Sequence, residues 1–199
     1  MSAADVVIID SGGANLASLR FALDRLGARS SVSADPAVVA AAPRILLPGV
    51  GAAADAMTRL RAARLVECLR GLRQPMLGIC LGMQLLFAHS EEGDTESLGL
   101  LEGTIRRIPG SADRPVPHMG WNTCELRHPD PLLTGIGERD YFYFVHSYAA
   151  AVMPFTSAAV EYGAALSAVV HRGNIHGVQF HPERSGAPGA RVLQNFLQL

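Results

Sequence analysis

The sequence predicts an α/β fold with a mostly parallel central sheet, helices on both faces and an antiparallel β extension. In the first half of the chain, short apolar runs typical of buried strands alternate with segments of helical periodicity, which favours parallel strands joined by helices. Beyond Gly99 the apolar runs are shorter and lie between turns, which indicates antiparallel pairing. The length of 199 residues fits one domain spanning 1–199, without a linker or an internal repeat.

The elements of the first half are expected in a regular order. The run 6–9 is a β-branched strand, and the turn at 11–13 leads into a helix whose leucines recur at helical spacing until Gly27 ends it. Further strands are expected around 30–32, at 44–47 and at 76–79. Helical stretches are expected from the turn at 48–51 to about residue 72, and from 81 to 87.

The second half is expected to be rich in short strands. The last of these, 175–180, is expected to return to the main sheet before a C-terminal helix with Val192, Leu193, Phe196 and Leu197 on one face. The other β-rich runs lie at 104–108, 121–126, 141–145, 158–162 and 168–170.

The composition excludes several classes of function. All 17 basic residues are arginine, so chemistry that needs a Schiff-base, pyridoxal-phosphate or P-loop lysine is excluded. A net charge of -1 predicts neither a nucleic-acid nor a membrane partner. The three cysteines, without CxxC spacing, favour a reducing cytoplasmic setting over a disulfide scaffold or a zinc site. No apolar run approaches the ~20 residues of a membrane span.

The segment Gly78-Ile79-Cys80-Leu81-Gly82 has the form of a nucleophile elbow, in which a tight strand-to-helix turn exposes the middle side chain. The positive end of the following helix would favour the thiolate of Cys80. The alternative is a buried cysteine between packing glycines, and these five residues alone do not decide between the two. For Cys68 and Cys124, packing is the better interpretation.

A thiol nucleophile needs a base, and the base needs a group that orients it. A strand ending at His181 could supply the base, and Glu183 could turn back to accept a hydrogen bond from its imidazole. Alone, this His-Pro-Glu segment favours a solvated loop, and its pairing with the cysteine elbow is what favours a catalytic interpretation. His146 is the strongest rival base, and no pair of histidines has the spacing typical of metal ligands.

Two glycine-containing turns allow an ordinary structural interpretation. The turn Pro48-Gly49-Val50-Gly51 could bring backbone N–H groups to a developing oxyanion, but its spacing alone favours a simple strand-to-helix turn. The turn at 11–15 lacks the spacing of a dinucleotide-binding fingerprint.

Together, the cysteine elbow and the segment Gln179-Phe180-His181-Pro182-Glu183 resemble the class I, triad-type glutamine amidotransferases, whose order is Cys, His, Glu. Two further segments, Pro117-His118-Met119-Gly120-Trp121-Asn122 and Tyr143-Phe144-Val145-His146-Ser147-Tyr148, are similar to the signature of the glutaminase subunits of imidazole glycerol phosphate synthases. The resemblance runs essentially end to end and implies the three-layer fold of that family.

The resemblance implies a glutaminase that needs no cofactor or metal and converts L-glutamine to glutamate and ammonia. Cys80 would be the nucleophile, His181 the proton shuttle and Glu183 its orienting group. The oxyanion hole would involve Val50 and Leu81. The implied glutamine-binding residues are Gly49, Gly51, Gln84, Glu92, Ser147 and Tyr148.

The resemblance also implies a heterodimer with a (β/α)8-barrel cyclase subunit, which would receive the ammonia for imidazole glycerol phosphate synthesis in histidine biosynthesis. Asn15, Trp121, Tyr143 and Arg184 would lie at the interface; Arg184 stands where many members have lysine. The sequence leaves two alternatives open. The chain could serve another synthase, or it could be a non-catalytic binding module of the same fold.

Overall fold

The computed structural model describes residues 5–11 and 16–199. Within them, eight strands form the central sheet, in the order β2-β1-β3-β4-β14-β13-β12-β9. The pairs from β2 to β14 are parallel, and those from β14 to β9 are antiparallel. The strands are β2 (Ser30–Ser33), β1 (Val6–Ile9), β3 (Ile45–Gly49), β4 (Met76–Cys80), β14 (Ile175–Val178), β13 (Ala165–Arg172), β12 (Thr156–Glu161) and β9 (Glu125–Leu126).

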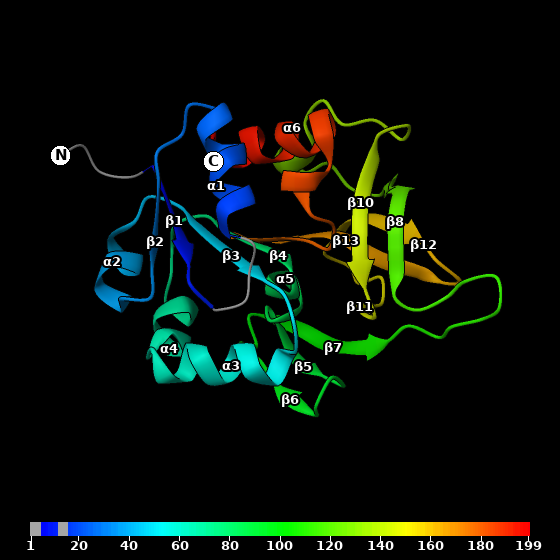
Figure 1. The fold of residues 1–199 in the computed structure, drawn as a ribbon, viewed down its shortest axis with the longest axis horizontal. Coiled ribbons are helices and arrows are strands. Elements are labelled where there is room, and N and C mark those ends of the chain that lie inside the picture. The colour runs from blue at the N-terminus through cyan, green and yellow to red at the C-terminus, as the bar shows by residue number, and fades with distance from the viewer. Residues whose placement is uncertain (1–4, 12–15) are drawn as a thin grey trace.

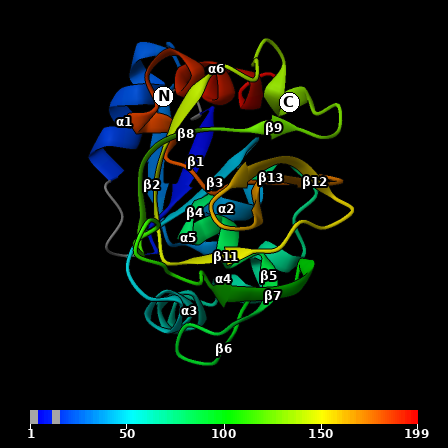
Figure 2. The ribbon, with the colours of Figure 1, turned by 90° about the vertical axis from the view of Figure 1, so that its right-hand side faces the viewer.

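Helices cover both faces of this sheet (Figure 1). Figure 2 shows the layers nearly edge-on, with α1 and α6 above the sheet and α3 below it. No helix in the described ranges is both long enough and apolar enough to cross a membrane. The helices are α1 (Leu16–Arg25), α2 (Pro36–Ala41), α3 (Ala53–Ala62), α4 (Leu65–Arg70), α5 (Leu81–Gln84) and α6 (Gly186–Phe196).

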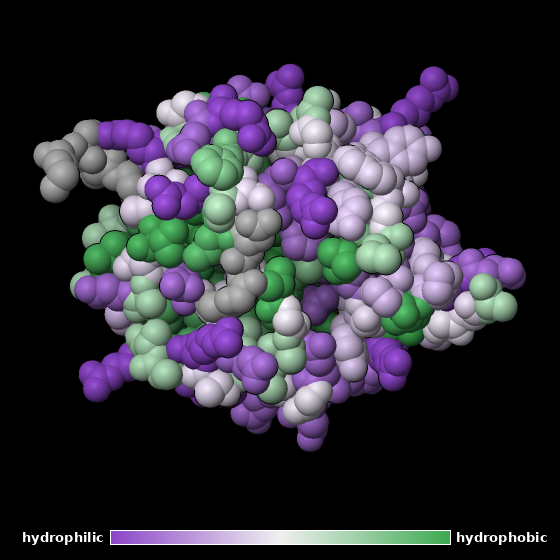
Figure 3. Space-filling model, in the orientation of Figure 1, coloured by the Kyte–Doolittle hydropathy of each residue, from purple (hydrophilic) through white to green (hydrophobic). Residues whose placement is uncertain are grey.

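The buried strands contribute to two apolar cores because alternate side chains point to opposite faces. In β1, Val6 and Ile8 pack on the side of α1 and α6, whereas Val7 and Ile9 pack on the side of α3 and α4. This two-sided burial explains why the strands read as continuous apolar runs. On the face seen in Figure 3, apolar residues gather near the middle and hydrophilic residues at the rim.

Two smaller sheets flank the central one. A two-stranded ribbon pairs β8 with β10, and a second sheet has the order β11-β7-β5-β6. Short 3-10 helices, η1 and η2, precede α6. These elements are β5 (Phe87–Ser90), β6 (Thr95–Glu96), β7 (Leu101–Arg107), β8 (His118–Thr123), β10 (Tyr141–His146), β11 (Tyr148–Ala150), η1 (Pro131–Leu133) and η2 (Pro182–Arg184).

The main expectations are confirmed, including the final strand, β14, which pairs with β4 in the central sheet. One pairing differs from the expected antiparallel extension: β7 is antiparallel to β11 but parallel to β5. Two helix boundaries were wrong. The helix after Cys80 ends at Gln84 rather than Phe87, because Phe87 begins β5 and pairs with Leu101. The long helix before residue 72 is two helices, because Arg64 has a left-handed φ of 57° between them. The sequence reading also missed α2, whose N-cap is Asp35.

The backbones of β4, α5 and β3 lie very close together at the turn that carries Cys80. A Cβ atom added to Gly82 would overlap the carbonyl oxygen of Leu47, and one added to Gly78 would lie 2.7 Å from the carbonyl of Gly82. Any larger residue at either position must therefore displace backbone. The two glycines hold the turn that carries Cys80 directly against the neighbouring strand.

We therefore expect Gly82→Ala to destabilise the fold by about 3 kcal/mol or more, because the added methyl group meets rigid backbone. Denaturant unfolding monitored by circular dichroism measures this change. Gly71→Ala is the matched control, since its added Cβ would make only ordinary contacts of 3.5 Å or longer. Equal stabilities of the two variants would contradict the close-approach explanation.

Candidate active site

Cys80 occupies a strained turn at the end of β4. Its backbone has φ 54° and ψ -113°, a conformation that non-glycine residues rarely adopt. The thiol sulfur lies 3.8 Å from the carbonyl oxygen of Val145 and 3.8 Å from the Nε2 of Gln179. The elbow interpretation therefore describes this backbone better than the packing alternative does, because packing alone does not require such strain.

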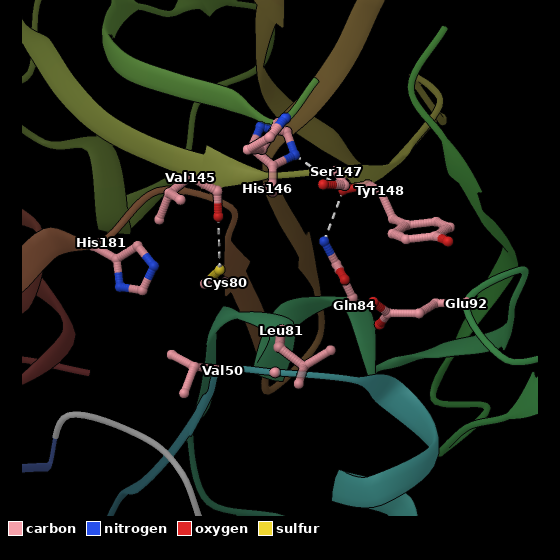
Figure 4. A pocket seen from close by; sticks show the side chains of 12 residues that line it. Val50, Cys80, Leu81, Gln84, Glu92, Val145, His146, Ser147, Tyr148 and His181 are labelled. Carbon is pink, nitrogen blue, oxygen red and sulfur yellow. Dashed lines mark hydrogen bonds between the residues drawn. The ribbon is translucent and has the colours of Figure 1, made fainter. Parts of the chain in front are cut away.

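Cys80 and His181 line the same cavity, which has a volume of about 300 Å³. In Figure 4, Cys80 lies between His181 on one side and Gln84 and Glu92 on the other. The cavity brings together most of the side chains that the sequence singled out. Its lining comprises Val50, Gly51, Cys80, Leu81, Gln84, Glu92, Pro117, Val145, His146, Ser147, Tyr148 and His181.

His181 and Glu183 form a buried pair behind the sulfur. The Nδ1 of His181 lies 2.9 Å from the Oε1 of Glu183, and the side chains are 9% and 7% exposed. No hydrogen-bond partner of the His181 Nε2 is found in the described part of the chain. Burial alone would lower the pKa of His181, but interactions with Cys80 and Glu183 outweigh it and raise the pKa to about 10. The imidazole is therefore held as a cation at neutral pH.

Strand β10 connects the nucleophile to the base. The carbonyl of Tyr143 accepts a hydrogen bond from the backbone N–H of His181 at 2.9 Å, and the carbonyl of Val145 faces the sulfur of Cys80. The fully buried hydroxyl of Ser185 adds a second link. It donates to the carbonyl of His181 at 2.6 Å and accepts from the N–H of Tyr143 at 3.0 Å. The sequence reading missed this role of Ser185.

A network of amides lies on the other side of the sulfur. The Nε2 of Gln84 donates to the carbonyl of Tyr148 at 2.8 Å and to the Oε1 of Gln179 at 3.0 Å. Gln179 is completely buried. No role was assigned to it from the sequence, although the expected strand 175–180 would place it on the same side as His181, two residues later.

The remaining candidates for glutamine binding surround this network. Glu92 accepts a hydrogen bond from the N–H of Ala53 at 2.8 Å and so caps the start of α3. Gly51, which lines the cavity, has a φ of +88°. Gly49 lies outside this lining, in a smaller neighbouring cavity that also contains Val50 and Glu183.

The two residues expected at the oxyanion hole lie beside the nucleophile. Gly49 pairs with Cys80 in the register of β3 and β4, so Val50 follows at the level of the elbow. Leu81 is the first residue of α5. Figure 4 shows both side chains on the opposite side of Cys80 from Val145.

His146, the rival base, is engaged on both ring nitrogens. Its Nδ1 lies 2.9 Å from the carbonyl of Tyr148, and its Nε2 lies 3.0 Å from the Nδ1 of His118. Burial lowers the pKa of His146 and of His118 to about 4. Because neither nitrogen of His146 is free and the ring stays neutral, the geometry favours His181 as the base.

The proposed interface residues lie largely on one ribbon. Trp121 is 56% exposed and packs edge-on against Tyr143, with ring centroids 5.9 Å apart. The guanidinium carbon of Arg184 lies 4.7 Å from the centroid of the Tyr143 ring. Met119 and Tyr141 are further exposed side chains of this ribbon. Asn15, also expected at the interface, lies outside the described residues.

One cluster of potential metal ligands lies outside the cavity. Asp130, His171 and His176 have ligand atoms within 4.8 Å of one another, a proximity that their sequence spacing did not indicate. The two imidazoles stack with centroids 4.2 Å apart and planes 15° apart, so their lone pairs run in nearly parallel planes. Asp130 already accepts hydrogen bonds from Ser157 and Leu132. We assign no metal to this cluster.

Comparison with known proteins identifies the family. The family model of "Glutamine amidotransferase class-I" matches residues 7–199. The chain belongs to the class-I glutamine amidotransferase family. This membership agrees with the cysteine elbow and the His-Pro-Glu segment, and confirms the family resemblance inferred from the sequence.

Curated class-I amidotransferase relatives match along almost their full length. A protein of Xanthomonas euvesicatoria named imidazole glycerol phosphate synthase subunit HisH is 54% identical over 195 residues, which cover 98% of each chain. The protein of the same name from Vibrio cholerae is 49% identical over 201 residues, again with 98% of each chain covered.

Solved structures confirm the class-I amidotransferase fold. A structure described as a putative GMP synthase protein from Thermoplasma acidophilum matches with a TM-score of 0.75 and 18% identity, covering 97% of this chain and 92% of that one. A structure described as a glutamine amidotransferase gives the same TM-score with 20% identity and 97% coverage of both chains.

The histidines predict how stability depends on pH. Burial also lowers the pKa of His176 to about 4, as for His118 and His146. These groups take up protons near pH 6.5 in the unfolded chain but not in the folded one, so stability should fall as the pH drops from 6.5 towards 4. His181 acts in the opposite direction. Its stabilising contribution is full below pH 6.5 and is lost as the pH rises to about 10.

Urea unfolding between pH 4 and 10, at constant ionic strength, measures both effects. We expect His176→Phe to reduce the loss of stability on the acid side, and Glu183→Gln to reduce the loss on the alkaline side. Variant profiles that run parallel to the wild-type profile over the whole range would contradict these assignments.

Proposed function

We propose that this chain is the glutaminase subunit of an imidazole glycerol phosphate synthase and releases ammonia from L-glutamine. The observation that carries the proposal is the arrangement around Cys80. A strained thiol shares a cavity with an imidazole that is paired with a buried carboxylate on one side, and with an amide network on the other. HisH-named relatives that are 49–54% identical over almost the whole chain support the choice of synthase.

In the first chemical step, the thiolate form of Cys80, paired with the imidazolium of His181, attacks the side-chain carboxamide carbon of glutamine; a C–S bond forms and the carbonyl oxygen becomes an oxyanion. The N–H groups of Val50 and Leu81 would stabilise the resulting oxyanion. The imidazolium of His181 then gives its proton to the leaving nitrogen, the C–N bond breaks and ammonia departs. Glu183 keeps the ring oriented through the 2.9 Å contact with its Nδ1.

In the second step, water hydrolyses the thioester. His181, now neutral, takes a proton from the water as the hydroxyl oxygen attacks the acyl carbon, and the C–S bond breaks. Glutamate leaves, and the thiolate–imidazolium pair is restored. Glu92 would hold the α-amino group of the substrate, while Gly51, Gln84, Ser147 and Tyr148, which line the same cavity, would complete its pocket.

The ammonia would pass to a (β/α)8-barrel cyclase subunit bound as a heterodimer. The relatives are named as subunits of a synthase, which supports an assembly of more than one kind of chain. The exposed apolar and aromatic side chains of the β8–β10 ribbon supply a surface for such a partner. Trp121, Tyr143 and Arg184 are the described residues proposed to contact it.

Cys80→Ala tests the proposed chemistry. Without the sulfur no thioester forms, so glutamine-dependent synthesis by the complex should fall by about four orders of magnitude or more. Synthesis supplied with free ammonia should continue. Cys124→Ala is the matched control, because Cys124 is a buried cysteine absent from the cavity lining. Glutamine-dependent synthesis that persists in the Cys80 variant would contradict the proposal.

Trp121→Ala tests the proposed partner surface. We expect the dissociation constant of the complex with the cyclase subunit to rise about thirtyfold, since an exposed tryptophan at an interface can contribute about 2 kcal/mol. Analytical ultracentrifugation or surface plasmon resonance measures this change. Val38→Ala, an exposed apolar position on α2, is the control. Equal affinity of the two variants for the cyclase subunit would contradict the proposal that the ribbon contacts it.

A further inference from the structure

Two buried histidines, His118 and His146, are not used by the proposed chemistry, although both belong to the segments that distinguish this chain. They are 3% and 5% exposed and pair directly across the β8–β10 ribbon. The ring of His118 is stacked between Phe144 and Tyr162, with centroids 4.9 Å and 4.0 Å away. This packing fixes the plane of the ring and therefore the directions of its nitrogens.

The direction of each hydrogen bond follows from its partners. A backbone carbonyl only accepts, so the Nδ1 of His146 must carry the proton that it shares with the carbonyl of Tyr148. In a neutral ring the Nε2 of His146 then accepts, and the Nδ1 of His118 donates to it at 3.0 Å. The Nε2 of His118 accepts in turn from the Nδ2 of Asn122 at 3.4 Å.

Asn122 fixes the other end of this series of hydrogen bonds. Its Oδ1 accepts from the N–H of Thr123, which assigns the Nδ2 as the nitrogen that faces His118. That nitrogen also donates to the carbonyl of Glu161 at 3.2 Å. Both amide hydrogens are therefore used, and the tautomers of both histidines are determined.

The carbonyl of Tyr148 joins this series of hydrogen bonds to the cavity, because it also accepts a hydrogen bond from the Nε2 of Gln84. The second hydrogen of that nitrogen goes to Gln179. With both N–H bonds donated inside the protein, Gln84 offers its carbonyl oxygen to a ligand. A bound glutamine would meet a fixed acceptor there and could donate to it from its carboxamide or ammonium nitrogen.

We propose that Asn122, His118 and His146 form a directional hydrogen-bond chain that positions Tyr148 and Gln84, so that Gln84 presents an acceptor to glutamine. The inference rests on the proposed function. These are positioning residues, because they act on the substrate through Gln84. The charge state agrees with this role, since burial lowers the pKa of both histidines and keeps them neutral, as the tautomer assignment requires.

Labelling of Cys80 by two electrophiles tests the chain of hydrogen bonds. A diazoketone analogue of glutamine needs the positioned pocket, whereas iodoacetamide needs only a reactive, accessible sulfur. Both rates are measured at Cys80 by peptide mass spectrometry, on the complex with the cyclase subunit. His118→Phe keeps an aromatic ring between Phe144 and Tyr162 but removes the donor. His118→Asn restores a donor nitrogen at about the position of the histidine Nδ1.

We expect His118→Phe to slow labelling by the glutamine analogue about tenfold, the effect of one lost hydrogen bond, and to change the iodoacetamide rate less than twofold. His118→Asn should recover most of the analogue rate. His176→Phe is the matched control, because it also replaces a buried, stacked histidine but lies outside the cavity lining. It should change neither rate.

Three results would overturn the inference. The analogue rate of His118→Phe could equal that of the wild type, both rates could fall together, or His118→Asn could be as slow as His118→Phe. Failure of the proposed function gives a different result, in the wild-type protein itself. There, iodoacetamide would label Cys80 and the glutamine analogue would not, and the inference would fall with the proposed function.

Discussion

The turn after β4 lies almost in contact with the backbone of strand β3, and the geometry of the site follows from this approach. Gly82 lies so near the carbonyl of Leu47 that no Cβ fits between them, and Gly78 lies against Gly82 itself. This contact allows the chain to reverse direction over very few residues. Cys80, between these two glycines, has a positive-φ backbone conformation. The strain is sustained because strands β3, β4 and β14 are paired on both sides of the turn and buried on both faces.

Strand β10 places His181 next to the strained turn at Cys80. The carbonyls of two of its residues contact groups from separate parts of the chain: that of Tyr143 accepts from the backbone N–H of His181, and that of Val145 faces the sulfur of Cys80. Tyr148, two residues beyond the strand, accepts from Gln84. The spacing of the catalytic groups is therefore set by backbone hydrogen bonds to one extended segment. The same strand presents Tyr143 to the exposed ribbon face, so the proposed partner surface and the cavity share one strand.

The histidines show how environment divides one residue type between two roles. For His118 and His146 desolvation by burial dominates, and their pKa values fall to about 4. His181 is buried as well, but its interactions with Cys80 and Glu183 outweigh the desolvation, and its pKa rises to about 10. The neutral rings can therefore hold fixed positions, while the cationic ring can stabilise a thiolate and deliver a proton. These charge states depend on neighbours that are distant in sequence.

Local patterns in the chain were enough to predict the alternation of strands and helices, because this depends on periodicity. They also marked the Cys80 turn and the His-Pro-Glu segment as candidates, but left a packing or loop interpretation open for each. They did not predict the end of the helix after Cys80, where pairing of Phe87 with Leu101 overrides local preference. The choice between His181 and His146 as the base required the folded structure. That choice depends on which groups bind their nitrogens, and those groups come from other strands. The roles of Ser185 and Gln179 emerged for the same reason, since hydrogen bonds across the fold leave no periodic pattern in the chain.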